Sequence, residues 1–272
     1  MDNHKDNAYI FPPVVSTERM EKVKKSKIKN IFIIVFISAV FLSLYVFHYN
    51  NSPKINIANL LKTNSLRSGD LVYRMNLFGV IPVASATFKA EGGHLSAKVE
   101  PLKSLQKFFK GSVVLDSYLD SGGHNPESFR QEIIIPGKQA QGKEVFYDQK
   151  NGIMTIKGIK RNILPDTQDP LSAVFNIRRM NLENISNLEM NINTNQKNYI
   201  FQAQITHQEI SVNKNIYKLA FLKAEIRRRD KNPYHKSQVD IVLVENQGEN
   251  IPVLIKVFAS GFFLNARLIE IK

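Results

Sequence analysis

The chain has 272 residues, and its 43% of apolar residues is enough for one sizeable folded domain with appendages. The absence of cysteine excludes disulfides, thiolate metal sites, cysteine nucleophiles and the lipid-modified cysteine of a bacterial lipoprotein. The formal net charge of +13 favours anionic partners such as nucleic acid, phosphate or acidic lipid headgroups, and charge alone does not choose among them.

A basic leader followed by an apolar run opens the chain. Residues 1–30 mix Asn, Asp, Pro and Lys, which predicts a disordered leader, and several lysines lie just before the apolar run. Residues 31–49 are long enough to span a bilayer, with a core that includes Ile31, Phe36, Phe41 and Phe47. The stretch HYNNSPK after it offers no small-residue cleavage site, so an uncleaved signal anchor is favoured over a cleaved signal peptide.

The distribution of basic residues predicts the orientation of this anchor. Far more lysines precede the run than follow it, which indicates a cytoplasmic N-terminus in a single-pass protein of the inner (cytoplasmic) membrane. Residues 50–68 then form a polar tether, and residues 69–272 form a periplasmic or otherwise extracytoplasmic domain. The basic cluster lacks interleaved aromatic residues, so we expect it to hold the leader beside anionic lipid and expect no nucleic-acid partner.

The extracytoplasmic part has the period-two pattern of β-strands. Leu71, Tyr73 and Met75 alternate with other residues, and Gly79 and Pro82 indicate the turn of a hairpin. Further strands are predicted at 95–99, 113–118, 129–135, 145–148 and 154–157, and the last third adds 199–206, 216–228 and a three-stranded meander. This pattern predicts a mainly β fold: an antiparallel, closed or half-open β-barrel with one or two short helices.

One stretch between the strands, TQDPLSAVFNIRRMNL, is typical of a helix of about ten residues. Asp169 lies where an N-cap belongs, Pro170 suits the first helical position, and Leu171, Val174 and Phe175 fall along one stripe. Three interpretations remain open: a helix that plugs one end of the barrel, a lid over an apolar cavity, or a catalytic element. The lid hypothesis assigns the cavity lining to Leu171, Val174, Phe175, Phe108 and Phe109.

Other candidate sites are sparse. Ser172 is the only candidate nucleophile, and no Gly-x-Ser-x-Gly elbow surrounds it. The six histidines have no metal-ligand spacing and no two carboxylates pair in the sequence, so we expect no catalytic, metal or cofactor site. The basic run at 225–236, which includes Arg227, Arg228 and Arg229, is either a solvated hairpin tip or a contact for an anionic partner.

Three stretches, in order and spacing, resemble a bacterial envelope family catalogued as domain of unknown function 3108. They are GDLVYRMNLFGVIPVASATFKA, DPLSAVFNIRRMNL and NIPVLIKVFASGFFLNARLIEI, and one departure is Ala84, where the family often has a second glycine. The resemblance implies an export signal or anchor and a β-rich fold, without an established activity. By looser analogy, it implies a likeness to the half-barrels of periplasmic lipoprotein carriers.

Two function hypotheses follow. The first is a membrane-anchored, non-enzymatic envelope protein that binds a lipid, a lipoprotein or another envelope component. The alternative is a structural or signalling domain that presents a surface to partner proteins, and a hydrolase that uses Ser172 is a distant third.

Overall fold

The computed structural model describes residues 69–107, 110–194, 196–212, 214–229, 236–259 and 261–272, which belong to one compact unit. The predicted leader, anchor and tether, together with Phe108 and Phe109, lie outside the described residues. Within the described ranges, no helix has the length and apolar character needed to cross a membrane.

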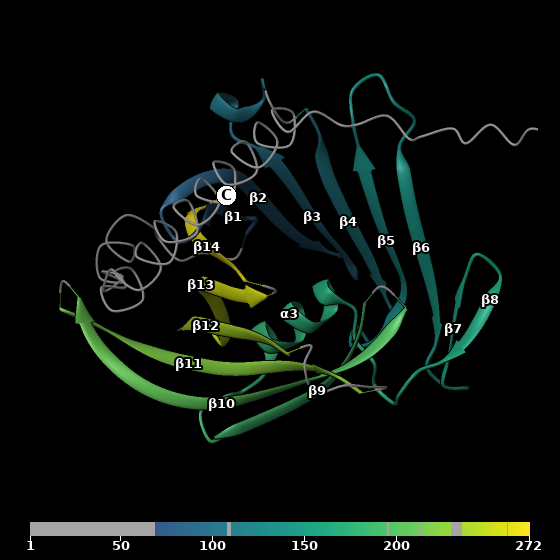
Figure 1. Cartoon of the computed structure of the whole chain (residues 1–272). Helices are drawn as coiled ribbons and strands as arrows, with labels where there is room; N and C mark the ends of the chain where they lie inside the picture. Colours follow the sequence, from purple (N-terminus) through teal and green to yellow (C-terminus); the bar gives the residue numbers. More distant parts are fainter. Residues whose placement is uncertain (1–68, 108–109, 195, 213, 230–235, 260) are drawn as a thin grey trace, which may run out of the picture. The chain divides into compact units, whose positions relative to one another are not determined.

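Fourteen antiparallel strands form a single sheet, which confirms the mainly β prediction (Figure 1). The first eight are β1 (Leu71–Leu77), β2 (Ile81–Glu91), β3 (His94–Pro101), β4 (Ser112–Leu119), β5 (Pro126–Ile134), β6 (Gln141–Asp148), β7 (Ile153–Ile156) and β8 (Ile159–Asn162). The last six are β9 (Asn187–Thr194), β10 (Lys197–Val212), β11 (Asn215–Arg228), β12 (Lys236–Asn246), β13 (Glu249–Ala259) and β14 (Phe262–Ile271).

The first and last strands join the two halves of the sheet. The strand order is β8-β7-β6-β5-β4-β3-β2-β1-β14-β13-β12-β11-β10-β9, so neighbours in the sheet are neighbours in sequence except at the β1–β14 seam. Beyond that seam, the backbone N–H of Asp70 donates to the carbonyl of Lys272 at 3.0 Å, and the reverse bond is 2.9 Å. A Cβ on Gly69 would lie 2.1 Å from the Lys272 carbonyl oxygen, so the close approach of the two chain segments requires a glycine there.

The sheet does not close on itself, so the closed form of the predicted barrel is wrong. The outermost strands β8 and β9 do not pair, and Gln168 of the connecting segment forms an isolated parallel bridge with Ile192 of β9. The N–H of Gln168 donates to the carbonyl of Asn191 at 2.8 Å, and the carbonyl of Gln168 accepts from the N–H of Asn193 at 2.8 Å. The connecting segment therefore covers the edge of β9 that would otherwise be free to aggregate.

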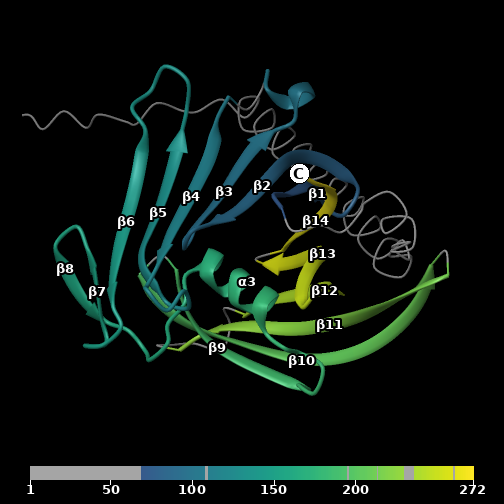
Figure 2. The same cartoon turned by 180° about the vertical axis from the view of Figure 1, so that it is seen from behind.

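The predicted helix is present as α3 (Pro170–Arg179) and lies on the inner side of the curved sheet (Figures 1 and 2). It contacts β3, β4, β9 and β13. Ala173 and Ile177 of α3 pack with Leu182 and with buried side chains of β9 to β12 in one hydrophobic core. A short 3-10 helix, η1 (Lys103–Leu105), follows β3.

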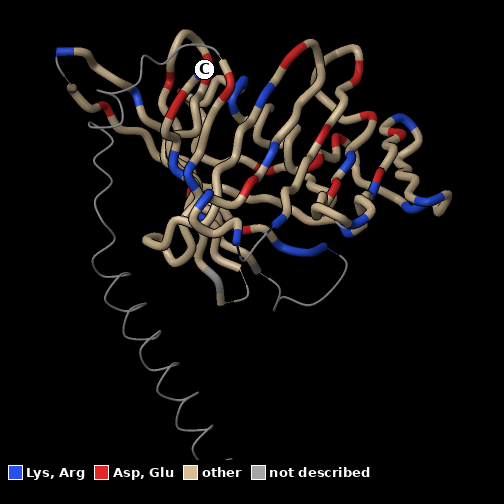
Figure 3. The backbone as a smooth tube through the Cα atoms, turned by 90° about the horizontal axis from the view of Figure 1, so that it is seen from above, with Lys and Arg blue, Asp and Glu red and all other residues tan. Residues whose placement is uncertain are grey.

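Charged residues are dispersed over the strands (Figure 3). On β1 to β4, side chains that point away from α3 are often polar, while those on the same side as α3 are apolar apart from Ser117. The outward set includes Arg74, Thr87, Lys98 and Asp116.

Candidate functional site: the inner face of the sheet around the helix

The N-terminus of α3 is capped as its sequence predicts. One carboxylate oxygen of Asp169 accepts from the backbone N–H groups of Leu171 at 2.7 Å and Ser172 at 3.1 Å. The hydroxyl of Ser172 accepts from the N–H of Asp169 at 2.9 Å, which completes a capping box. The other carboxylate oxygen of Asp169 accepts from the Ser117 hydroxyl on β4 at 2.6 Å, so the cap also fastens the helix to the sheet.

This cap is entirely buried, and burial changes its acid–base chemistry. Asp169 and Ser117 have no exposed surface. Desolvation raises the pKa of Asp169, against the lowering effect of its hydrogen bonds from Ser117, Ser172 and Leu171. Desolvation likewise raises the pKa of the nearby Tyr147, and the Asp169 carboxylate adds to that shift. The cap is therefore a dry, fully hydrogen-bonded element of the core.

The C-terminal end of α3 is fastened by the first two residues of β13. The side-chain amide of Asn250 donates to the carbonyls of Ile177 at 3.2 Å and Met180 at 2.6 Å. Arg178 pairs with Glu249 at 3.0 Å, and the guanidinium lies 5.7 Å from the centroid of the Phe88 ring on β2. Opening the helix would break buried hydrogen bonds at both ends, which favours a fixed plug over a movable lid.

The predicted lining residues on α3 lie at different depths. Leu171 is buried, whereas Val174 and Phe175 are half-buried, and the Phe175 ring lies 5.3 Å from the Arg179 guanidinium. The core contacts come instead from Ala173 and Ile177, which the stripe interpretation missed. The sheet contacts α3 from β3 and β4 as well as from β9 and β13, so the buried surface of the helix is wider than one stripe.

Beyond the helix, the same side of the sheet carries an apolar surface that remains half-buried. Ser117 and Phe88 identify this side, because both contact α3. Residues that pair across neighbouring strands face the same side of the sheet. Leu115 pairs with Ala97 and Val99 pairs with Ala86, so these side chains continue the same apolar surface away from the helix. We call this set the inner wall: Met75, Leu77, Ala84, Ala86, Ala97, Val99, Val113, Leu115, Leu264 and Ala266, all half-buried.

The composition of the inner wall differs from that of a filled core. None of its residues is charged or polar, and four of the ten are alanines. Ala84 and Ala266 flank Met75 on the two neighbouring strands. Half-buried apolar atoms gain free energy when another apolar group covers them. The inner wall can therefore accept an apolar ligand.

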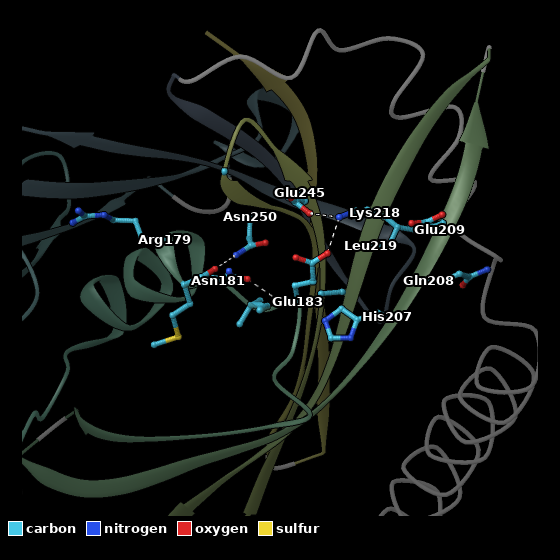
Figure 4. Close-up of a pocket in the computed structure, with 14 residues that line it drawn as sticks. Arg179, Asn181, Glu183, His207, Gln208, Glu209, Lys218, Leu219, Glu245 and Asn250 are labelled. Carbon is cyan, nitrogen blue, oxygen red and sulfur yellow. Dashed lines mark hydrogen bonds and ion pairs between the residues drawn. The ribbon is translucent and has the colours of Figure 1, made fainter.

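A pocket of about 390 Å³ with a mixed polar and apolar lining lies beside the C-terminal end of α3 (Figure 4). The ammonium of Lys218 lies 2.9 Å from Glu183 and 4.0 Å from Glu245, and His207 also lines the pocket. The hydrogen bond and charge of Lys218 lower the pKa of Glu183, and those of Glu183 raise the pKa of Lys218. These ion pairs are about half exposed, so they contribute little to stability.

The described residues offer no cluster of three metal-ligating side chains. Ser172 is fully buried, and its hydroxyl is engaged in the capping box. These contacts give Ser172 a structural role and leave it out of reach of a substrate.

The basic run lies at the end of β11, and its residues 230–235 fall outside the described part of the chain. Arg227 contacts Gln202 and Glu225, and Arg229 contacts Asn191 at 3.1 Å and Glu189 at 3.5 Å. Arg228 lies between them near the end of β11 and is half-buried. Arg227 and Arg229 are thus engaged within the sheet.

We compared the chain with protein-family models, with curated proteins and with solved structures, and none of them matches it.

Proposed function

We propose that this protein is held in the cytoplasmic membrane by residues 31–49 and that its extracytoplasmic domain binds an amphiphile without catalysing a reaction. The acyl chain of a lipid, or of a lipid-modified protein, lies along the inner wall. The alternative, a domain that presents a surface to partner proteins, stays a prediction.

One observation carries the proposal: the inner wall is apolar, uncharged and only half-buried. A packed barrel would fill this side with large, buried side chains, whereas here Ala86, Ala97 and Ala266 are small and half-buried. An acyl chain suits such a surface, because each buried methylene contributes roughly 0.8 kcal/mol. The buried contacts at both ends of α3 keep the helix in place and leave the inner wall as the surface for the ligand.

Native mass spectrometry of the full chain, released from detergent micelles, tests the proposal. We expect a retained adduct with the mass of a cellular lipid. The double variant Ala86→Leu/Ala97→Leu fills the inner wall and loses the adduct. The matched control Thr87→Leu/Ser96→Leu adds the same side chains to the outer side of the same two strands and keeps it.

Two results would count against amphiphile binding. One is a wild-type protein that carries no adduct, and the other is equal retention by the two double variants. Circular dichroism of each variant checks that the sheet is intact, so that a lost adduct is not mistaken for a lost fold.

A further inference from the structure

Exposed aliphatic side chains lie at one end of strands β1 to β5. Val80 in the β1–β2 turn is 57% exposed, and Ile81 at the start of β2 is 50% exposed. Ile133, Ile134 and Ile135 are 36–40% exposed where β5 ends. These five account for half of the ten exposed large hydrophobic residues among the described residues. Isolated exposed aliphatic residues need no explanation, but a group of five at one edge does.

The strand directions place these residues along one row of strand ends. β1, β3 and β5 all end on this side of the sheet. The β1–β2 turn, the connection from β3 to β4 and the β5–β6 turn lie there. Ile81 and Ile133 pair with Leu77 and Val113 of the inner side, whereas Ile134 pairs with Ser112 of the outer side. Figures 1 and 2 show η1 and the β5–β6 turn along the upper edge of the sheet. We call the five aliphatic residues, together with Lys103, Lys107, Lys110 and Lys138, the rim.

Three of the four rim lysines line a hollow. Lys103, Lys107 and Lys110 line a depression of about 520 Å³ together with Ile134 and Pro136, and Glu100 also lines it. No ion pair joins these three lysines or Lys138 to an acidic residue within the described ranges.

The acidic residues next to the rim already have partners. Glu100 pairs with Lys98 at 2.8 Å, and Glu132 pairs with Arg130. The rim therefore presents aliphatic groups beside four lysines that have no ion-pair partner among the described residues.

We propose that the rim docks onto an anionic lipid bilayer, with the aliphatic side chains entering the interface and the lysines binding lipid phosphates. Charge complementarity selects this partner, because an anionic membrane surface attracts clustered lysines and its interface accepts apolar side chains. This inference goes beyond the proposed function and does not depend on it.

The inner wall and the rim are continuous. Leu77 lies at the end of β1 next to the β1–β2 turn, and Val99 and Val113 lie on either side of the β3–β4 connection. The contacts with α3 are further away, at Ser117 and Phe88. A rim docked on a bilayer thus turns the open end of the inner wall towards the lipid.

Site-specific fluorescence in the full chain tests the docking, because the sequence contains no cysteine and a single one can be introduced. The variants Ile81→Cys and Ile134→Cys carry an environment-sensitive dye on the rim. Ile216→Cys and Ile269→Cys are matched controls, since these isoleucines are 70% and 39% exposed but lie away from the rim. Each protein is reconstituted into vesicles of phosphatidylcholine with 30% phosphatidylglycerol and a nitroxide-labelled lipid.

We expect quenching and a blue shift at Ile81→Cys and Ile134→Cys, and neither at the two controls. Charge reversal of Lys103, Lys107, Lys110 and Lys138 to Glu should reduce the quenched fraction at least tenfold, since each lysine near an anionic surface contributes on the order of a factor of five. Vesicles of phosphatidylcholine alone should give the same reduction.

Equal quenching at rim and control positions would overturn the proposal, because it would report only the proximity that an anchor imposes. Quenching that is unchanged by charge reversal or by neutral lipid would also overturn it. Adduct retention in the mass spectrometry above is measured separately, so failure of docking and failure of amphiphile binding are distinguishable.

Discussion

Two substitutions of Asp169, at the N-terminus of α3, distinguish the contribution of its hydrogen bonds to stability from that of its buried charge. Asp169→Ala removes the acceptor for the N–H groups of Leu171 and Ser172 and leaves the buried Ser117 hydroxyl without its partner. A lost cap costs about 1 kcal/mol, and a buried polar group without a partner costs about 1–3 kcal/mol. We therefore expect a loss of about 2–4 kcal/mol in the free energy of unfolding.

Asp169→Asn should behave differently. The amide oxygen can still accept from Leu171 and Ser172, and the amide N–H can donate to the Ser117 hydroxyl. Burial disfavours the charged carboxylate, so removing the charge stabilises the fold. This gain offsets the loss of stability from the altered hydrogen bond to Ser117. We expect the Asn variant to stay within about 1 kcal/mol of the wild type.

Thermal unfolding of the full chain in detergent, followed by far-ultraviolet circular dichroism, measures both variants. For a domain of this size, about 2–4 kcal/mol corresponds to a Tm lower by about 5–15 °C for Asp169→Ala. Equal destabilisation by Ala and Asn, or no effect of Ala, would refute the assignment of Asp169 as a cap that fastens α3 to β4.

Three further predictions use the same measurement. The raised pKa of Asp169 means that folding favours its protonated form. Its contribution to the free energy of unfolding is therefore complete below the pKa that Asp169 has in the unfolded chain, and is lost as pH rises through its pKa in the folded protein. The wild type should therefore lose stability relative to Asp169→Asn as pH rises from acid, and a constant difference would contradict this. Asn250→Ala removes two hydrogen bonds to the last turn of α3 and should cost about 2–3 kcal/mol, whereas an unchanged Tm would mean that Asn250 does not hold the helix. Gly69→Ala places a methyl group 2.1 Å from the Lys272 carbonyl oxygen and should cost about 1–3 kcal/mol by separating the β1–β14 seam, so a stable Ala variant would show that the seam can shift.

The elements that depend on neighbouring residues could be predicted from the sequence. The strand predicted at 113–118 is β4 (Ser112–Leu119), because alternation along a few residues fixes which side chains face the core. The helix begins after Asp169 because an aspartate followed by proline suits the start of a helix and little else.

Features that depend on distant segments could not be predicted. Ser117 meets Asp169 across 52 residues, and Asn250 meets Ile177 across 73, and no local pattern signals either contact. The pairing of Gln168 with β9 is a further contact between segments that no local pattern signals. The alternation of apolar and polar residues in a single sequence indicates that β9 is a strand. It does not indicate which segment pairs with that strand.

The candidate site was partly foreseeable. Alternation marks Ala97 and Leu115 as facing the same side as the core, but only the position of α3 shows that the helix leaves them half-buried. The sequence therefore pointed to the helix as the lining, whereas the structure places most of the apolar surface on the strands.

Photo-crosslinking at two adjacent positions of β4 tests amphiphile binding most directly. A photoreactive phenylalanine analogue replaces either Leu115, which faces the inner side, or Val114, which faces the outer side; both side chains are half-buried. The full chain is expressed in cells fed radioactive palmitate, and membranes from these cells are irradiated. We predict radioactive adducts at position 115 and none at position 114, and equal labelling at the two positions, or none at 115, would contradict the account.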